Sequence, residues 1–203
     1  MESFVNAWKN ATTRIFTGVL MFSFSGIIGG LLAGVTLISG SLGGVMWLSG
    51  LVGIIMIVGY VLYIGGLSDL QRILSTADAS SISKVKTAVI LLIIGSCVST
   101  LFSLVPLLGT VVGAVISGVL NLIGCILCVM AFAALKKSQT FPQSAMGGIT
   151  KLYLAYLLNL IGYIAAITIV LALFTPILNL ISFIFVLIGW SALKNAEVTE
   201  PAA

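Results

Sequence analysis

The chain contains one pair of nucleophiles at a spacing known from redox chemistry. Cys125 and Cys128 have the Cys-x-x-Cys spacing of thiol oxidoreductases, in which the reactive thiolate lies near a helix N-terminus and near water. Here both thiols fall inside a long apolar stretch, and Cys97 lies in another. Free cysteines in such surroundings behave as small apolar side chains. We therefore interpret the pair as part of a packed helix face rather than as a redox centre.

The most polar side chains within the apolar stretches are amides and hydroxyls. An amide in hydrocarbon is costly without a hydrogen-bond partner, so we expect these groups to face inward between helices. Structural hydrogen bonding between helices is their common use. The alternative is a small polar site in the interior of the bundle. The residues concerned are Asn121, Asn159 and Asn179, together with Ser96, Ser99 and Thr100.

The inventory of side chains excludes most other chemistry. Histidine is absent, which removes the commonest general base and metal ligand. The apolar stretches contain no acid or base in their interior, whereas ion-coupled transporters usually carry ionisable groups there. Asp69 follows a Gly-Gly pair but has no second aspartate to form a catalytic dyad. We predict no catalytic, metal-binding or cofactor-binding residue, and a protein that is not an enzyme.

The composition predicts that membrane-spanning helices position these groups. Of the 203 residues, 60% are hydrophobic and 7% are charged, whereas a soluble domain is roughly one-quarter charged. A bilayer core about 30 Å thick needs roughly 20 apolar residues per helix. The sequence predicts one all-α domain, a polytopic transmembrane helical bundle. Its six expected spans are 15–38, 42–66, 86–105, 108–135, 151–174 and 176–193.

The charges predict the orientation of these spans. Three short links between spans carry no charge, and the remaining segments hold all nine lysines and arginines. Because basic residues are retained in the cytoplasm, both termini are expected inside, which makes three tandem hairpins. The net charge of +4 is thus a topology signal. A nucleic-acid-binding protein would have a dense basic face with interleaved aromatic residues, and this sequence has none. The expected partner is therefore the lipid bilayer.

Two charged segments have helical periodicity of their own. Phe4, Trp8 and Ala11 recur at helical spacing before the first span, and Leu67, Leu70 and Leu74 recur after the second. This pattern predicts short interfacial helices over 3–14 and 68–78 that lie on the membrane. An ordinary loop is the alternative. A capping box, formed by Ser68 and Gln71, would begin the second interfacial helix.

Similar segments near the ends of the even-numbered spans indicate an internal repeat. Val119-Leu-Asn-Leu-Ile123 leads to Ala134-Leu-Lys136, and Ile177-Leu-Asn-Leu-Ile181 leads to Ala192-Leu-Lys194 at equal spacing. Leu51 to Ile55 and the following Gly66-Leu-Ser68 have the same spacing. The repeated unit is one hairpin, used three times in the same direction. Such parallel repeats differ from the inverted repeats of many transporters.

Several of these segments resemble a known group of proteins. Gly66-Leu-Ser-Asp-Leu70, followed by Leu91-Leu-Ile-Ile-Gly95, is similar to an uncharacterised prokaryotic family of multi-spanning inner-membrane proteins of unknown function. Trp190-Ser-Ala-Leu-Lys194 is similar to the span endings of that family. The resemblance covers at most the last three quarters of the chain. It implies a prokaryotic inner-membrane protein and contributes no functional residue.

Small residues form stripes on two of the predicted spans. Such stripes let helix backbones approach closely, either within one chain or in a seam between chains. We expect packing between the six spans to be their main use, with a homo-oligomeric seam as the alternative. The stripes comprise Gly18, Gly26, Gly30 and Gly34 in the first span and Gly109, Gly113 and Ser117 in the fourth.

Two functions from different classes agree with this pattern. The first is a non-enzymatic structural or accessory subunit that acts through helix–helix contacts with itself or with another membrane protein. Its motivation is the small amount of sequence outside the predicted spans. The second is a carrier or channel for a neutral or lipid-like small molecule, which the inward amides and hydroxyls would bind.

Overall fold

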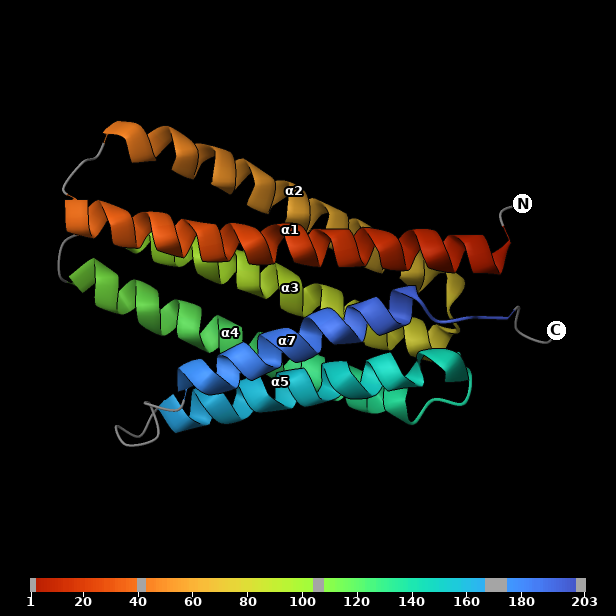
Figure 1. Ribbon diagram of the computed structural model, residues 1–203. Coiled ribbons are helices and arrows are strands. Elements are labelled where there is room, and N and C mark those ends of the chain that lie inside the picture. The colour runs from red at the N-terminus through yellow and green to blue at the C-terminus, as the bar shows by residue number, and fades with distance from the viewer. Residues whose placement is uncertain (1–2, 40–42, 104–107, 167–174, 200–203) are drawn as a thin grey trace.

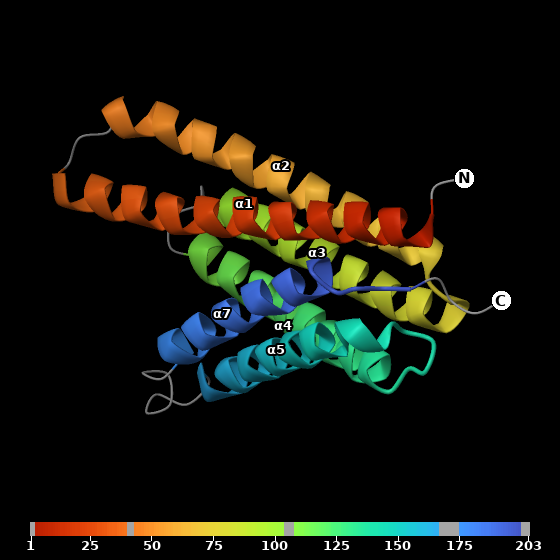
Figure 2. The same cartoon turned by 45° about the vertical axis from the view of Figure 1, so that its right-hand side comes forward.

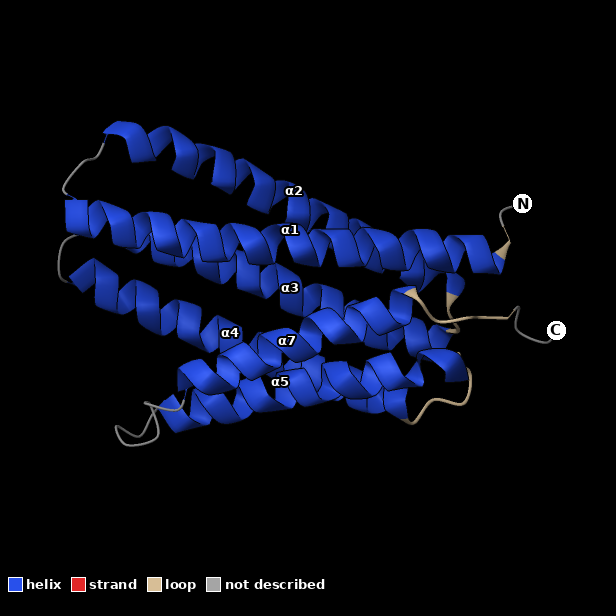
Figure 3. Ribbon diagram, in the orientation of Figure 1, coloured by secondary structure: helices blue, strands red, loops and turns tan. Residues whose placement is uncertain are grey.

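The structure, a computed structural model, describes residues 3–39, 43–103, 108–166 and 175–199. Within these ranges the chain forms long α-helices, one short 3-10 helix and no strand (Figure 3), so the predicted all-α bundle is confirmed. The elements are α1 (Phe4–Ser39), α2 (Gly43–Ile73), α3 (Thr76–Ser103), α4 (Leu108–Lys136), η1 (Gln143–Ala145), α5 (Met146–Ala166) and α7 (Thr175–Lys194).

Six of these helices are long and apolar enough to cross a membrane. Their outer faces are also apolar: Leu31, Leu101 and Val111 are 67%, 65% and 63% exposed. Soluble monomers rarely expose apolar patches of more than a few hundred Å². The chain is therefore a multi-pass membrane protein whose outer faces contact lipid.

The separate interfacial helices expected over 3–14 and 68–78 do not form in the structure. Residues 4–14 are the first turns of α1, and 68–73 are the last turns of α2. Their apolar stripes pack into the bundle: Trp8, Ala11 and Leu70 are almost fully buried. The amphipathic pattern was therefore correct, but the buried face contacts neighbouring helices rather than the membrane surface.

The capping box predicted at Ser68 does not form, and the helix cap lies further along the chain, at Ser75. Ser68 is inside α2, and its hydroxyl donates a hydrogen bond to the Ile64 carbonyl at 2.9 Å. The cap lies at the start of α3, where the Asp78 backbone N–H donates to Ser75 Oγ at 3.3 Å. Ser75 thus satisfies one of the free backbone donors of this helix. α3 consequently starts ten residues before the span expected from residue 86.

The helices pair in chain order and close into a ring. α1 packs on α2, α3 on α4, and α5 on α7, which makes three hairpins. The second helix of each hairpin also contacts the first helix of the next, and α7 contacts α1 (Figure 1). Both termini lie at one end of the ring, together with the connection between α2 and α3 and that between α4 and α5 (Figure 1). All described charges lie at or near this end, which we call the charged end.

Each hairpin is held by a small residue that faces the backbone of the partner helix. A Cβ added at Gly18 would lie 2.6 Å from the Gly59 carbonyl oxygen of α2, and one at Gly148 would lie 2.7 Å from that of Gly189 in α7. A Cβ at Gly124 of α4 would lie 3.2 Å from a backbone oxygen of α3. Lipid chains are as apolar as the side chains, so helices in a membrane associate through such close packing.

The core is concentrated toward the charged end. Ile15, Leu67, Leu135 and Leu193 have no exposed surface there. Toward the other end the α1–α2 hairpin diverges from the α5–α7 hairpin, as Figures 1 and 2 show. The bundle is therefore closed at the charged end and more open at the opposite end.

The connections at the charged end are tied to one another by a buried carboxylate. Asp78 is 2% exposed, and its Oδ2 accepts hydrogen bonds from the Ser75 hydroxyl at 2.9 Å and the Thr140 hydroxyl at 2.6 Å. Trp8 closes the ring nearby, because its indole N–H donates to the Leu193 carbonyl at 3.1 Å. These bonds join the segment between α2 and α3 to that between α4 and α5, and α1 to α7.

Replacing Gly18 by leucine is expected to lower the free energy of unfolding in mild detergent by about 1–3 kcal/mol or more, because the side chain would meet the backbone of α2. Gly26→Leu is the matched control on the same helix, since a Cβ there would meet no heavy atom within 4 Å. The Gly26→Leu variant should have an unchanged or slightly higher free energy of unfolding, because leucine has a higher helix propensity than glycine. Equal losses in both variants would contradict this packing.

Candidate functional site

An interior pocket lies where the closed core of the bundle ends. Its volume is about 200 Å³, and all three hairpins contribute to its lining. The lining is mainly aromatic and aliphatic, with a few polar groups and no charged side chain. It comprises Phe22 and Ser23 of α1, Tyr60 and Tyr63 of α2, Val89 and Leu92 of α3, Tyr156 and Asn159 of α5, and Asn179, Ser182, Phe183 and Val186 of α7.

A layer of aromatic rings joins the hairpins beside this pocket. Tyr63 meets Trp190 edge to face with ring centroids 5.8 Å apart, and Trp190 meets Phe132 in the same way at 6.2 Å. Phe132 stacks on Tyr156 at 5.5 Å. Such ring pairs contribute about 0.5–1.5 kcal/mol each beyond the burial of their area. The layer therefore gives the pocket a rigid wall.

Two polar atoms in this layer are buried without a well-aligned hydrogen bond. Tyr63 is 2% exposed and Trp190 is fully buried, and neither Tyr63 Oη nor Trp190 Nε1 forms a hydrogen bond of good geometry, although the Tyr63 hydroxyl lies near the polar groups of Tyr156 and Trp190. The Tyr63 ring also contacts Phe22, with the two rings tilted and their centroids 5.7 Å apart. Trp8, by contrast, has its indole N–H satisfied by a carbonyl. A buried hydroxyl left fully unsatisfied costs about 1–3 kcal/mol, and the poor alignment of Tyr63 with its polar neighbours leaves part of this cost in place.

Two of the three predicted amides meet in the pocket. Asn159 comes from α5 and Asn179 from α7, and both line it. The hydroxyl of Ser182, on α7, donates to the Ala155 carbonyl of α5 at 2.8 Å and fixes the two helices against each other. Of the six residues named for the alternative of an interior polar site, Asn159 and Asn179 therefore line this pocket.

The other predicted polar residues lie elsewhere. Asn121 is at the contact of α3 with α4, where its Oδ1 faces Gly95 and has no described hydrogen-bond partner. Ser96 and Thr100 are on the exposed face of α3, and their hydroxyls donate to carbonyls one turn earlier at 2.9 Å. Ser99 lies against Gly113 of α4. None of these four lines the pocket.

The glycines of the two predicted stripes also differ in their surroundings. Gly113 is buried between Phe102 and Ser99, at a helix contact. Gly26 is exposed and touches no other helix. Gly30 and Gly34 lie in α1 and Gly109 in α4, but their surroundings fall outside what the structure describes.

The cysteine pair packs between helices as the sequence indicated. Cys125 and Cys128 are 5% and 1% exposed, and the Cys125 thiol donates to the Tyr156 carbonyl of α5 at 3.1 Å. Cys97 is exposed on α3. No group of three or more metal-ligating side chains gathers within the described ranges.

The tyrosines of the pocket were not anticipated from the sequence. The predicted spans include Tyr60, Tyr63 and Tyr156, whose rings add to their apolar character although each also carries a hydroxyl. Tyrosine is common where helices leave the membrane, so its presence near a charged segment gave no distinctive signal. Only the packing of three hairpins brings Tyr63 and Tyr156 to one pocket.

Comparison with protein-family models, with curated proteins and with solved structures finds no match to this chain.

Replacing Tyr63 by phenylalanine is expected to leave the empty protein as stable as the wild type, or more stable by about 1 kcal/mol, because it removes an unsatisfied buried hydroxyl. Tyr163→Phe is a matched control, since Tyr163 is 37% exposed on α5 and does not line the pocket. Its unfolding should match that of the wild type. Denaturant titration in detergent measures both; a clear loss in Tyr63→Phe alone would mean that the hydroxyl is already paired.

Proposed function

We propose that the interior pocket binds a small neutral, lipid-like molecule and that the protein acts as its carrier in the cytoplasmic (inner) membrane. The observation that carries the proposal is the Tyr63 hydroxyl, which is buried in the pocket lining without a well-aligned hydrogen bond, although Tyr156 and Trp190 are its polar neighbours. Unsatisfied buried polar atoms are rare in native proteins and call for a ligand or an ordered water. A ligand group that hydrogen-bonds to Tyr63 would remove this cost.

The lining favours a neutral ligand with both polar and apolar parts. The polar side chains of the lining are hydroxyls and amides, including Asn159 and Asn179. The lining contains no charged side chain. A charge bound there would lose its hydration without gaining a counter-charge, which is strongly unfavourable. The aromatic rings of Phe22 and Phe183 suit an apolar body. A volume of about 200 Å³ is below that of most ligand pockets, so it fits the polar group and the first carbons of such a molecule.

Binding is favoured over conduction by the closed core. Leu67, Leu135 and Leu193 are fully buried toward the charged end of the bundle. A channel would need a continuous polar path past them. We therefore favour a carrier or binding protein over a channel.

Direct binding measurements on the purified protein in mild detergent test this function. We expect 1-oleoylglycerol to bind, and oleate, which has a similar chain and a charge, to bind more weakly. Tyr63→Phe should weaken oleoylglycerol binding about three- to tenfold, the loss of one hydrogen bond. Tyr163→Phe should bind like the wild type. Equal affinity of the wild type and Tyr63→Phe, or tighter binding of oleate, would overturn the proposal.

The accessory-subunit function keeps one observation in its favour. Gly26 is a small residue on an exposed face of α1 that touches no other helix of the chain. Small residues exposed to lipid allow another helix to approach closely. A second copy or a different membrane protein could pack there. Loss of an assembly in Gly26→Leu, with the fold intact, would support this second function.

We also propose that the three hairpins are copies of one unit. Two lysines at equivalent positions, at the ends of α4 and α7, support this relation because each lies over an aromatic ring of the next hairpin. Lys136 at the end of α4 lies over the Tyr153 ring of α5, 5.5 Å from its centroid. Lys194 at the end of α7 lies over the Phe16 ring of α1 at 5.2 Å. The same contact thus joins the second to the third hairpin and the third to the first. The buried Leu67, Leu135 and Leu193 occur at matching positions of the three units.

The proposed topology has both termini in the cytoplasm, because every lysine and arginine is then on the cytoplasmic side. In intact cells, a membrane-impermeant maleimide should label a cysteine introduced at Ser41 and miss one at Ser138. Disruption of the membrane should make Ser138→Cys reactive. The wild-type chain, with its three native cysteines, is the control for background labelling. The reverse pattern would overturn the orientation.

A further inference from the structure

An open groove between α1 and α2 at the charged end gathers cations from both helices. It is lined by Lys9, Arg14 and Arg72, with Asp69 as its one acid. Its volume is about 770 Å³, and Asn10 and Thr13 also face it. The groove is separate from the interior pocket, because the two have no lining residue in common.

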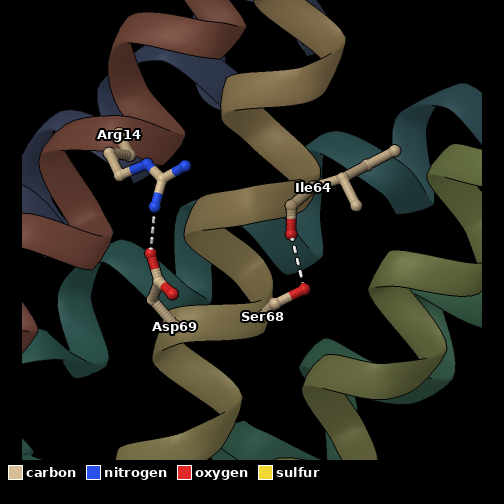
Figure 4. A network of polar contacts seen from close by, with 4 residues as sticks. All are labelled: Arg14, Ile64, Ser68 and Asp69. Atoms are coloured by element: carbon tan, nitrogen blue, oxygen red, sulfur yellow. Dashed lines mark hydrogen bonds and ion pairs between the residues drawn. The ribbon is translucent and has the colours of Figure 1, made fainter.

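Arg14 is held in a fixed position within this groove. Its guanidinium packs against α2 at Gly65, where a Cβ would come within 2.6 Å of Arg14 Nη2. Nη1 forms an ion pair with Asp69, as Figure 4 shows. A guanidinium has five N–H donors, and this bond uses one of them. Arg14 is therefore oriented by α2 and still has donors to offer.

The groove has an excess of positive charge. Arg14–Asp69 is the one ion pair within the described ranges, so no described carboxylate pairs with Lys9 or Arg72. Both side chains are exposed. Arginine and lysine at such a site bind phosphate groups, the arginine through paired N–H donors.

The faces next to the groove indicate where this phosphate comes from. The groove residues belong to the membrane-crossing segments of α1 and α2, near their charged ends. Further along α2, Val61 and Ile57 are 62% and 61% exposed. Asp69 and Val61 are eight residues apart, or about 12 Å along a helix. A phosphate in the groove would thus have an apolar surface beside it for attached acyl chains, which a free anion does not need.

We propose that this groove binds the headgroup of an anionic phospholipid, with the acyl chains against the exposed face of α2. Basic pockets between membrane helices have the chemistry for such headgroups. The headgroup phosphate bridges Arg72 and Lys9 and accepts from the remaining donors of Arg14. This lipid is part of the boundary of the protein and is not the neutral molecule of the interior pocket.

Native mass spectrometry of the full chain in mild detergent tests the proposal, with dioleoyl phosphatidylglycerol and dioleoyl phosphatidylcholine as probes. We expect the wild type to retain phosphatidylglycerol preferentially. The double variant Lys9→Gln with Arg72→Gln should lose roughly tenfold or more of that preference. Lys136→Gln with Lys137→Gln is the matched control, because it removes the same charge at the same end but outside the groove. It should keep the preference.

Two results would overturn the proposal. Equal loss in the control variant would mean that general surface charge, not the groove, selects the lipid. Displacement of phosphatidylglycerol by inorganic phosphate at millimolar concentration would mean a free-anion site. Unchanged thermal unfolding of both double variants shows that they are folded. Oleoylglycerol binding should be unaffected in either, so failure here is distinguishable from failure of the pocket.

Discussion

The close approach of helix backbones within each hairpin is the constraint on which the rest of the structure depends. Hydrocarbon gives apolar helices little reason to associate, so packing distance decides whether they pair. Gly18 against Gly59 and Gly148 against Gly189 bring their helices into backbone contact toward the charged end. The hairpins are tight there and diverge beyond it (Figure 2). The interior pocket occupies the transition, because it begins where the helices separate.

The polar groups of the bundle fall into two contrasting sets along its axis. At the charged end, Asp78 receives hydroxyl donors, Arg14 is paired with Asp69, and the Trp8 indole has a carbonyl. Deeper in the bundle, the polar atoms of Tyr63 and Trp190 lack a well-aligned hydrogen bond. The first set stabilises a structural end, where water can assist. The polar atoms of the second set lie in the part of the molecule that hydrocarbon surrounds, and hydrocarbon supplies no alternative hydrogen-bond donor or acceptor.

Hydropathy was enough to predict six spanning helices and their pairing, because length and charge position follow from the bilayer itself. It did not distinguish a helix face that contacts protein from one that contacts a membrane surface. Trp8 and Leu70 therefore seemed interfacial, although both are in the core. For the same reason hydropathy did not distinguish the amides from one another. Asn159 and Asn179 line the pocket, whereas Asn121 is at a helix contact. Which amides converge depends on how the hairpins turn toward each other, and that information lies in contacts between distant segments.

The hydrogen bond between Trp8 and Leu193 has a consequence for how the protein is made. Its two residues are 185 positions apart, near opposite ends of the chain. Each hairpin can pair as soon as its second helix leaves the ribosome, because its partner directly precedes it. The seam between α1 and α7 has no such neighbour. Until α7 has been synthesised, α1 has an open flank with the Trp8 indole N–H unpaired, and the ring closes only when α7 arrives.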